Sequence, residues 1–208
     1  MNDEAYFVVK RVINNVERRY IERLNLRFIG NDIAPENAYF VDSGLSYDGV
    51  PADEFSGLAH LEGETVSILA DGNVVNDLVV TSGAVTIPFE ASKVHIGLPY
   101  TCTIESLDYE LRTEGSPTIH DKERNVNSVV IKLDNTRALN IGPTEDDLEE
   151  QSFRTDEDAG DPTKLFSGDK EIPLNPGDGN EAVVMIQNTD PLPIDILSII
   201  SKLDIGDV

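Results

Sequence analysis

The sequence has no Trp and a single Cys, Cys102, among its 208 residues. One cysteine excludes an intrachain disulfide and a metal cluster built from cysteines. Other aromatic residues are also scarce, with seven Phe and six Tyr. The core must therefore be built from Val, Ile and Leu, and the β-branched residues among these favour strands. A chain of this length can form one large domain or two small ones.

Long apolar runs are missing as well. No stretch of the sequence reaches the roughly 18 consecutive apolar residues that a transmembrane helix needs. The segment Met1–Lys10 lacks the basic and apolar regions of a signal peptide. We therefore expect the chain to fold in the cytoplasm of the cell that makes it, with no membrane partner.

Positive charge is in short supply, because 16 Lys and Arg face 39 Asp and Glu, giving a net charge of −23. Such an excess disfavours tight binding of nucleic-acid phosphates, anionic lipids or heparin. The distribution is uneven: residues 1–30 hold six bases and four acids, whereas residues 142–190 hold 14 acids and three bases. The acidic segment Thr144–Asp161 either keeps the protein soluble or takes part in its function.

The first 30 residues predict a β-hairpin arm. Ala5–Ile13 is rich in residues that favour strands, and Asn14-Asn15 separates it from a second run, Val16–Leu24. Asn tolerates the positive φ of a tight hairpin turn, so two such runs across this pair favour a hairpin. A short amphipathic helix over Val16–Leu24 is the alternative.

The clearest β pattern covers Phe55–Tyr100. The alternating run Thr65–Ala70 ends at Asp71-Gly72, a pair typical of a type I′ turn, and Ser82-Gly83 supplies the next turn. Turn signals recur about every 8–12 residues, as in a small barrel or sandwich. We therefore predict a small β-barrel or sandwich over residues 36–100.

Shorter signals flank and punctuate this block. Tyr39–Val41 is predicted to be a short strand, followed by turns at Asp42–Gly44 and Tyr47–Gly49. Five glycines are expected to mark points where strands end and the chain turns: Gly57, Gly63, Gly72, Gly83 and Gly97.

Residues 101–208 are predicted to form a second, loop-rich antiparallel β module containing the acidic loop 144–161. The last expected strand could instead be a helix, but a Pro-rich turn feeding a β-branched run favours a strand. The whole chain is thus predicted to be all-β. The expected strands of this module are Thr101–Arg112, Asn125–Asp134, Ser152–Arg154, Leu165–Phe166, Glu171–Leu174, Ala182–Gln187 and Asp195–Lys202.

The three histidines, His60, His95 and His120, lie far apart and show no metal-ligand spacing such as H-x-H or HExxH. His60 has Glu62 and Glu64 on what would be the same strand face, which is a weak pattern for a metal site. His95 lies in an alternating strand, where a structural hydrogen bond is the expected role. We therefore predict no metal site, no cofactor and no catalytic residue.

Other catalytic patterns are also missing. The sequence contains no G-x-S-x-G elbow, no P-loop and no strand-anchored G-x-G-x-x-G. Cys102 is expected to be buried in a strand and inert. The tract Asp156–Asp161 resembles a calcium loop only loosely, because the EF-hand glycine and glutamate positions fall on Asp161 and Ser167. An adventitious calcium site there is the alternative to a solvated loop.

Three blocks carry a family resemblance: FVDSGLSYDG from Phe40, SGLAHLEGETVSILADGNVV from Ser56, and KVHIGLPYTCTIESL from Lys93. With the opening strand pair and the Asp190–Ile194 turn, they resemble the C-terminal part of the tail nozzle, or tail tubular B-like, proteins of short-tailed bacteriophages. The positions most specific to this resemblance are expected to define the fold: His60, Leu61, Glu62, Gly63, Asp71, Gly72, His95, Gly97, Leu98, Pro99 and Tyr100.

The resemblance implies a structural virion protein, made in the bacterial cytoplasm and located in the phage tail. It implies a homo-oligomeric ring of six copies, with adaptor and fibre proteins as partners, around a path that DNA crosses without specific binding. An acidic wall fits such a path, because it repels the phosphates instead of gripping them. The alternative is a receptor- or carbohydrate-binding β module at the tail tip, and an enzyme fits least.

Overall fold

The computed structural model describes residues 4–24, 34–109, 124–175 and 182–205. Strands make up 61% of these residues, which confirms the all-β prediction. No α-helix occurs among them; the only helical turns are the 3-10 turns η1 (Pro35–Asn37), η2 (Ala59–Leu61) and η3 (Glu145–Asp147). Within the same ranges, no helix has the length and apolarity needed to cross a membrane.

The chain divides into two compact units that are not continuous in sequence. Unit 1 comprises Met1–Tyr100 together with Thr155–Lys164, and unit 2 comprises Thr101–Arg154 and Leu165–Val208. Part of the acidic loop therefore belongs to unit 1, although the residues on both sides of it belong to unit 2.

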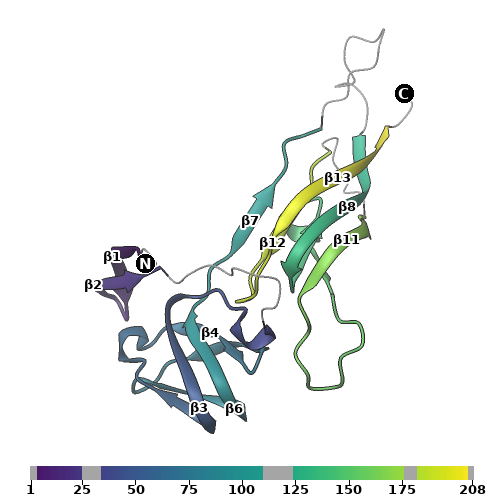
Figure 1. The fold of residues 1–208 in the computed structure, drawn as a ribbon. Helices are drawn as coiled ribbons and strands as arrows, with labels where there is room; N and C mark the ends of the chain where they lie inside the picture. The colour runs from purple at the N-terminus through teal and green to yellow at the C-terminus, as the bar shows by residue number, and fades with distance from the viewer. Residues whose placement is uncertain (1–3, 25–33, 110–123, 176–181, 206–208) are drawn as a thin grey trace. The chain divides into compact units, whose positions relative to one another are not determined.

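The N-terminal hairpin is formed as predicted. Strands β1 (Tyr6–Ile13) and β2 (Val16–Arg23) pair antiparallel over their whole length (Figure 1). Asn14 and Asn15 have φ values of 48° and 60°, as a type I′ turn requires. The helix alternative for Val16–Leu24 is wrong.

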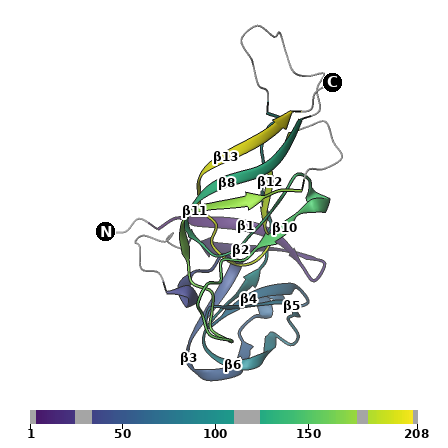
Figure 2. The ribbon, with the colours of Figure 1, turned by 90° about the vertical axis from the view of Figure 1, so that its right-hand side faces the viewer.

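The rest of unit 1 is built on one four-stranded antiparallel sheet with the order β3-β6-β4-β5. Its strands are β3 (Asp42–Ser56), β6 (Ala84–Leu98), β4 (Thr65–Ala70) and β5 (Asn73–Val79), which Figure 2 shows as one open sheet. No closed barrel is formed by the described strands, so the barrel alternative for residues 36–100 is excluded. Aliphatic residues of all four strands, including Ile68 and Ile96, fill its core.

Strand β3 differs most from the expectation. Tyr39–Val41 is not a strand, and the two turns expected at Asp42–Gly44 and Tyr47–Gly49 lie inside the 15-residue β3. The turn residues are accommodated by register shifts between Asp42 and Leu45 and between Asp48 and Ala52. Such bulges let an extended strand contain residues that usually mark turns.

Gly97 is the next-to-last residue of β6, so a strand ends beside it as predicted, but the residue itself is buried and in the strand. A Cβ on Gly97 would come within 2.6 Å of the carbonyl oxygen of Asp42. The residue is therefore required by the close approach of the neighbouring strand and not by a turn.

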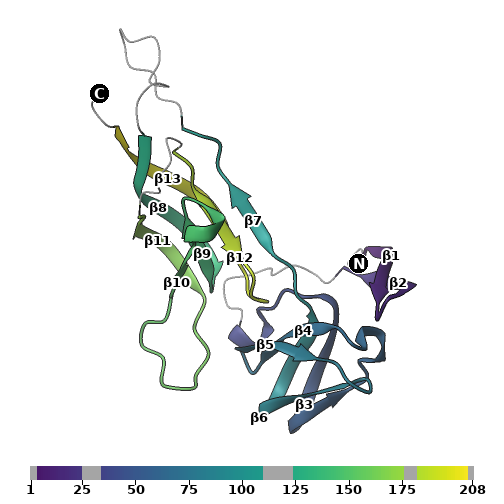
Figure 3. The same ribbon diagram turned by 180° about the vertical axis from the view of Figure 1, so that it is seen from behind.

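Unit 2 contains two antiparallel sheets (Figure 3). One has the order β10-β9-β12-β7 and the other β11-β8-β13. Buried residues of both sheets, such as Ile131 of β8 and Ile141 of β9, belong to one hydrophobic cluster, so the sheets share a core. The strands are β7 (Cys102–Glu105), β8 (Arg124–Thr136), β9 (Leu139–Gly142), β10 (Glu149–Gln151), β11 (Phe166–Pro173), β12 (Met185–Asn188) and β13 (Ile196–Ile205).

Several strand boundaries in unit 2 were predicted wrongly. The strand expected over Thr101–Arg112 is limited to β7, and its last three positions lie outside the described residues. No strand covers Ser152–Arg154, and the two short strands expected near Phe166 and Ile172 are one continuous strand, β11. The final run is a strand, β13, so its helix alternative is wrong.

The turn between β4 and β5 connects distant parts of unit 1. The Asp71 carboxylate accepts hydrogen bonds from the main-chain N–H of Ser92, at 3.0 Å, and of Lys93, at 2.8 Å. Gly72 follows with a φ of +81°, and an added Cβ would lie 2.8 Å from Cβ of Pro162. The turn is thus held by β6 on one side and crowded by the segment Thr155–Lys164 on the other.

This crowding predicts the effect of Gly72→Ala. We expect the free energy of unfolding to fall by about 1–3 kcal/mol, from a positive φ in an L residue and from the contact with Pro162. Gly160→Ala is the matched control, because Gly160 also has a positive φ but a Cβ there would meet no atom within 4 Å. Urea unfolding measures both changes, and an equal loss in the two variants would contradict the crowding.

Candidate assembly surface

The register of the hairpin gives it two distinct faces, because directly paired residues lie on the same face of an antiparallel sheet. On the inner face, Val9 pairs with Tyr20, and Ile13 pairs with Val16. Ile13 is only 4% exposed and belongs to the core of unit 1, against which Tyr20 also packs. Part of the inner face thus belongs to that core.

Polar contacts fix the turn end of the hairpin. The Tyr20 hydroxyl donates to the carbonyl oxygen of His60 at 3.3 Å, and the two rings meet edge to face. The main-chain N–H of Asn14 donates to the Glu64 carboxylate at 3.0 Å. His60 and Glu64, which the sequence offered as a weak metal pattern, both serve to hold the hairpin.

An ion pair fixes the middle of the hairpin. Arg11 donates two hydrogen bonds to Glu22, from Nε at 3.0 Å and from Nη2 at 2.9 Å. The Ser43 hydroxyl of β3 also donates to Glu22, at 3.1 Å, and Asp42 lies 3.5 Å from Arg11. The hydrogen bonds from Arg11 lower the pKa of Glu22, and those to Glu22 raise the pKa of Arg11. This group therefore joins the hairpin to the first residues of β3.

The outer face of the hairpin is apolar and exposed. Tyr6 is 60%, Val8 72%, Val12 63% and Ile21 78% exposed, and Val8 pairs directly with Ile21. Apolar residues on both faces are typical of strands that are buried on both faces. In the described part of the chain, only the inner face is covered.

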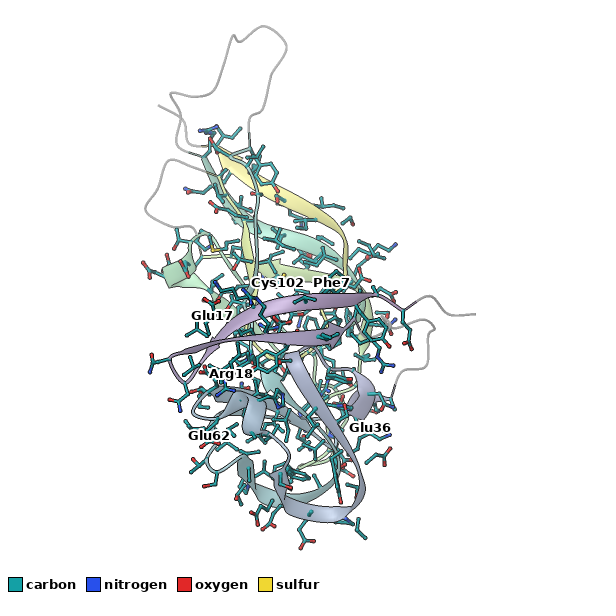
Figure 4. All side chains as sticks on the ribbon, turned by 90° about the vertical axis from the view of Figure 1, so that its left-hand side faces the viewer. Phe7, Glu17, Arg18, Glu36, Glu62 and Cys102 are labelled. Carbon is teal, nitrogen blue, oxygen red and sulfur yellow. The ribbon has the colours of Figure 1, made fainter. Side chains whose placement is uncertain are left out.

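Charged residues on this outer face are mainly basic. The register places Lys10, Arg19 and Arg23 on it; Glu17 lies 2.6 Å from Lys10 and 4.0 Å from Arg19, and Glu4 lies 3.1 Å from Arg23. Glu17 lies near the turn end of the hairpin and Phe7 near its other end, as labelled in Figure 4. We call this combination of apolar and basic side chains the outer hairpin face: Tyr6, Val8, Lys10, Val12, Glu17, Arg19, Ile21 and Arg23.

The positions His60–Gly63 form a small scaffold beside the hairpin. Nε2 of His60 lies 3.0 Å from the carbonyl oxygen of Ser43, and Leu61 is completely buried. The Glu62 carboxylate accepts the main-chain N–H groups of Ser82 and Gly83, at 2.9 and 2.6 Å. Glu62 therefore holds the turn after β5, although it was expected on a strand face with His60.

The second group of motif positions lies in and after β6. His95 is 7% exposed, its Nδ1 lies 2.7 Å from the Ser46 hydroxyl, and its ring stacks on Tyr39 at 3.7 Å. Burial lowers the pKa of His95. Gly97 and Leu98 end β6, and Pro99 and the exposed Tyr100 follow it, up to the end of the first segment of unit 1.

The carboxylates of the acidic loop accept hydrogen bonds from residues in or close to the same loop. Asp156 accepts from Nζ of Lys164 at 3.0 Å, and Glu157 accepts the main-chain N–H groups of Thr155 and Lys164. These main-chain bonds lower the pKa of Glu157 to about 2. Among the residues the structure describes, no group of three or more His, Cys, Asp or Glu is arranged to hold a metal ion, and His120 lies outside them.

Cys102 was predicted to be buried, and this is wrong. It lies on β7 as expected, but it is exposed, as are the other three residues of this strand. The reason is the position of β7 at the edge of its sheet, which the sequence pattern does not reveal.

No protein-family model matches this sequence, and no curated protein matches it. The likeness to phage tail nozzle proteins therefore depends on the sequence blocks alone.

Sequence reasoning found the hairpin but missed its exposed outer face. The signal was present, because β1 carries apolar residues at both odd and even positions, such as Val8 and Val9. A strand with one solvent-exposed face would show polar residues at every second position.

The ion pair in the middle of the hairpin predicts the effect of Glu22→Gln. We expect the free energy of unfolding to fall by about 1 kcal/mol, because a partly buried, doubly hydrogen-bonded pair loses its charge. The control is Glu17→Gln, whose exposed pair with Lys10 should contribute less than about 0.5 kcal/mol. Both are measured by urea unfolding.

The effect of Glu22→Gln should also depend on pH. Because the pKa of Glu22 is lowered in the folded chain, its contribution is present above its ordinary value of 4.5 and is lost as the pH falls through the lowered pKa. The difference between wild type and Glu22→Gln should therefore shrink in acid. A difference that stays constant would contradict the ion pair.

His95 predicts a second pH dependence. Its pKa is lowered mainly by burial and further by Lys93, while Glu36 and Asp48 act in the opposite direction. The folded chain thus binds this proton more weakly than the unfolded chain, so stability is lost as the pH falls below the ordinary value of 6.5. His95→Phe keeps a ring beside Tyr39 and removes the titration. Between about pH 8 and pH 5, wild type should lose more stability than this variant, whereas parallel curves would contradict the assignment.

Proposed function

We propose that this chain is a structural, non-enzymatic part of a bacteriophage tail, and that six copies assemble into a ring in the nozzle wall. The proposed assembly is supported by the outer hairpin face, where four large apolar side chains are exposed. The opposite face of the same hairpin packs against the core of unit 1. Exposed apolar patches of this kind are typical of protein interaction sites. The assignment to a phage tail depends on the resemblance of the sequence blocks.

The energetics favour covering this face. Burying a Val or Ile side chain completely contributes about 1.5–3 kcal/mol. Val8 pairs directly with Ile21, and Val12 lies four residues further along β1 on the same face, so one partner surface can cover all three. Their ordered backbone adds little conformational cost to binding, because the inner face already holds the hairpin in place.

The charge of the chain supports a role beside DNA that does not involve gripping it. A net charge of −23 repels a duplex. The segment Glu145–Glu150 adds exposed acidic residues and contains no basic residue that would offset this repulsion. DNA could slide along such a wall, because no phosphate contacts release counterions.

The alternative, a receptor- or carbohydrate-binding module, has less support. Exposed aromatics grouped on one set of loops would favour it. Among the described residues, the exposed aromatics Tyr6 and Phe7 lie on β1, Phe89 lies on β6, and Tyr100 follows β6. They are placed on strands and not in a loop cluster.

The proposal is tested by the oligomeric state of the purified chain. Light scattering after size exclusion and native mass spectrometry should show a discrete species of six copies, with subunits exchanging slowly on dilution. Fluorescence anisotropy with a labelled DNA duplex should show no binding at physiological salt. A monomer at every concentration, or a glycan-array signal from such a monomer, would contradict the proposal.

A further inference from the structure

We propose that the outer hairpin face of one copy binds the bulged middle of the β3–β6 ladder of a second copy. This inference depends on the self-assembly proposed above and names the two surfaces that meet. It follows from the complementary chemistry of two surfaces of the same chain. One combines apolar with basic residues, and the other combines apolar with acidic residues.

The second surface has the complementary chemistry. Val50 is 79% exposed and Phe89 38% exposed, and Asp53, Glu54 and Glu90 are exposed around them. We call these five residues the acidic ladder patch. No Lys or Arg occurs between residues 47 and 91.

The pairing of β3 with β6 brings these residues to one level of the sheet. Ala52 pairs with Ala91, and Glu54 pairs with Thr86, so Asp53 and Glu90 lie between these rungs on neighbouring strands. Val50 lies in the bulged stretch between Asp48 and Ala52. Since β3 is an edge strand of its sheet, another chain can approach the acidic ladder patch.

The two surfaces of one copy cannot bind each other. Its hairpin is held at the first residues of β3, where Arg11 lies 3.5 Å from Asp42 and Ser43 donates a hydrogen bond to Glu22. The inner face is buried in the core through Ile13, so the outer face is directed away from its own sheet. The partner that fits the outer hairpin face is therefore a second molecule.

The two surfaces are different parts of the chain, so their contact is head to tail. A pair of bound copies still offers one free hairpin and one free acidic ladder patch, and the assembly grows until it closes on itself. The opposite charges of the two surfaces orient the copies and oppose pairing of like surfaces.

Reciprocal charge reversal tests this contact in the full-length chain. The first variant, Lys10→Glu with Arg19→Glu, makes the hairpin acidic, and the second, Glu54→Lys with Glu90→Lys, makes the ladder patch basic. Sedimentation velocity should show that each variant alone self-associates roughly tenfold or more weakly than wild type, because like charges then meet. An equimolar mixture of the two should restore association, because every contact in it again joins opposite charges.

The control is Lys132→Glu with Lys202→Glu, which changes the net charge as the first variant does but alters exposed residues of β8 and β13. It should associate like wild type, and circular dichroism should show that all variants are folded. If wild type assembles but either variant associates equally well, or the mixture fails to restore association, the inferred contact is wrong while the proposed assembly stands.

Two further outcomes would overturn the contact. A wild-type chain that remains monomeric would remove the proposed function together with this inference. Sedimentation of monomeric wild type with phosphatidylglycerol vesicles, lost in the first variant, would assign the outer hairpin face to an anionic lipid surface instead.

Discussion

The insertion of one face of the N-terminal hairpin into the core of unit 1 is the contact on which the rest depends. A two-stranded hairpin alone is at best marginally stable in water. Burial of Ile13 and the ion pair of Arg11 with Glu22 give this one a defined position. Because that position uses the inner face, the apolar outer face stays exposed, and it is the surface that we propose for assembly.

Charge has a comparable influence at larger scale. The chain is strongly acidic, but its first 30 residues hold more bases than acids. Several of these bases lie on the hairpin together with exposed apolar residues. Such a distribution keeps most of the surface repulsive toward other copies and toward DNA. It confines attraction to a small area, which favours an ordered assembly over aggregation.

The fold class and the tight turns were accessible from the sequence, because they depend on local chemistry. Asn14-Asn15 and Asp71-Gly72 adopt the positive φ values that these residue types tolerate. Strand β3 was not accessible, since its Ser-Gly and Asp-Gly pairs signal turns, and only pairing with β6 extends them. The exposure of Cys102 depends on strand order, and strand order is a property of the tertiary structure. The same holds for the candidate surface: its residues are visible in the sequence, but the uncovered face is not.

The discontinuity of unit 1 has a consequence for the order of events during synthesis. All strands of this unit lie before Tyr100 and can pair while the ribosome is still translating the second half of the chain. The segment Thr155–Lys164 emerges later and adds its contacts at the β4–β5 turn, where Asn73 donates to the carbonyl oxygen of Gly160 at 3.2 Å. Unit 1 is therefore completed only after the first segment of unit 2, Thr101–Arg154, has been made, so the synthesis of the two units overlaps in time.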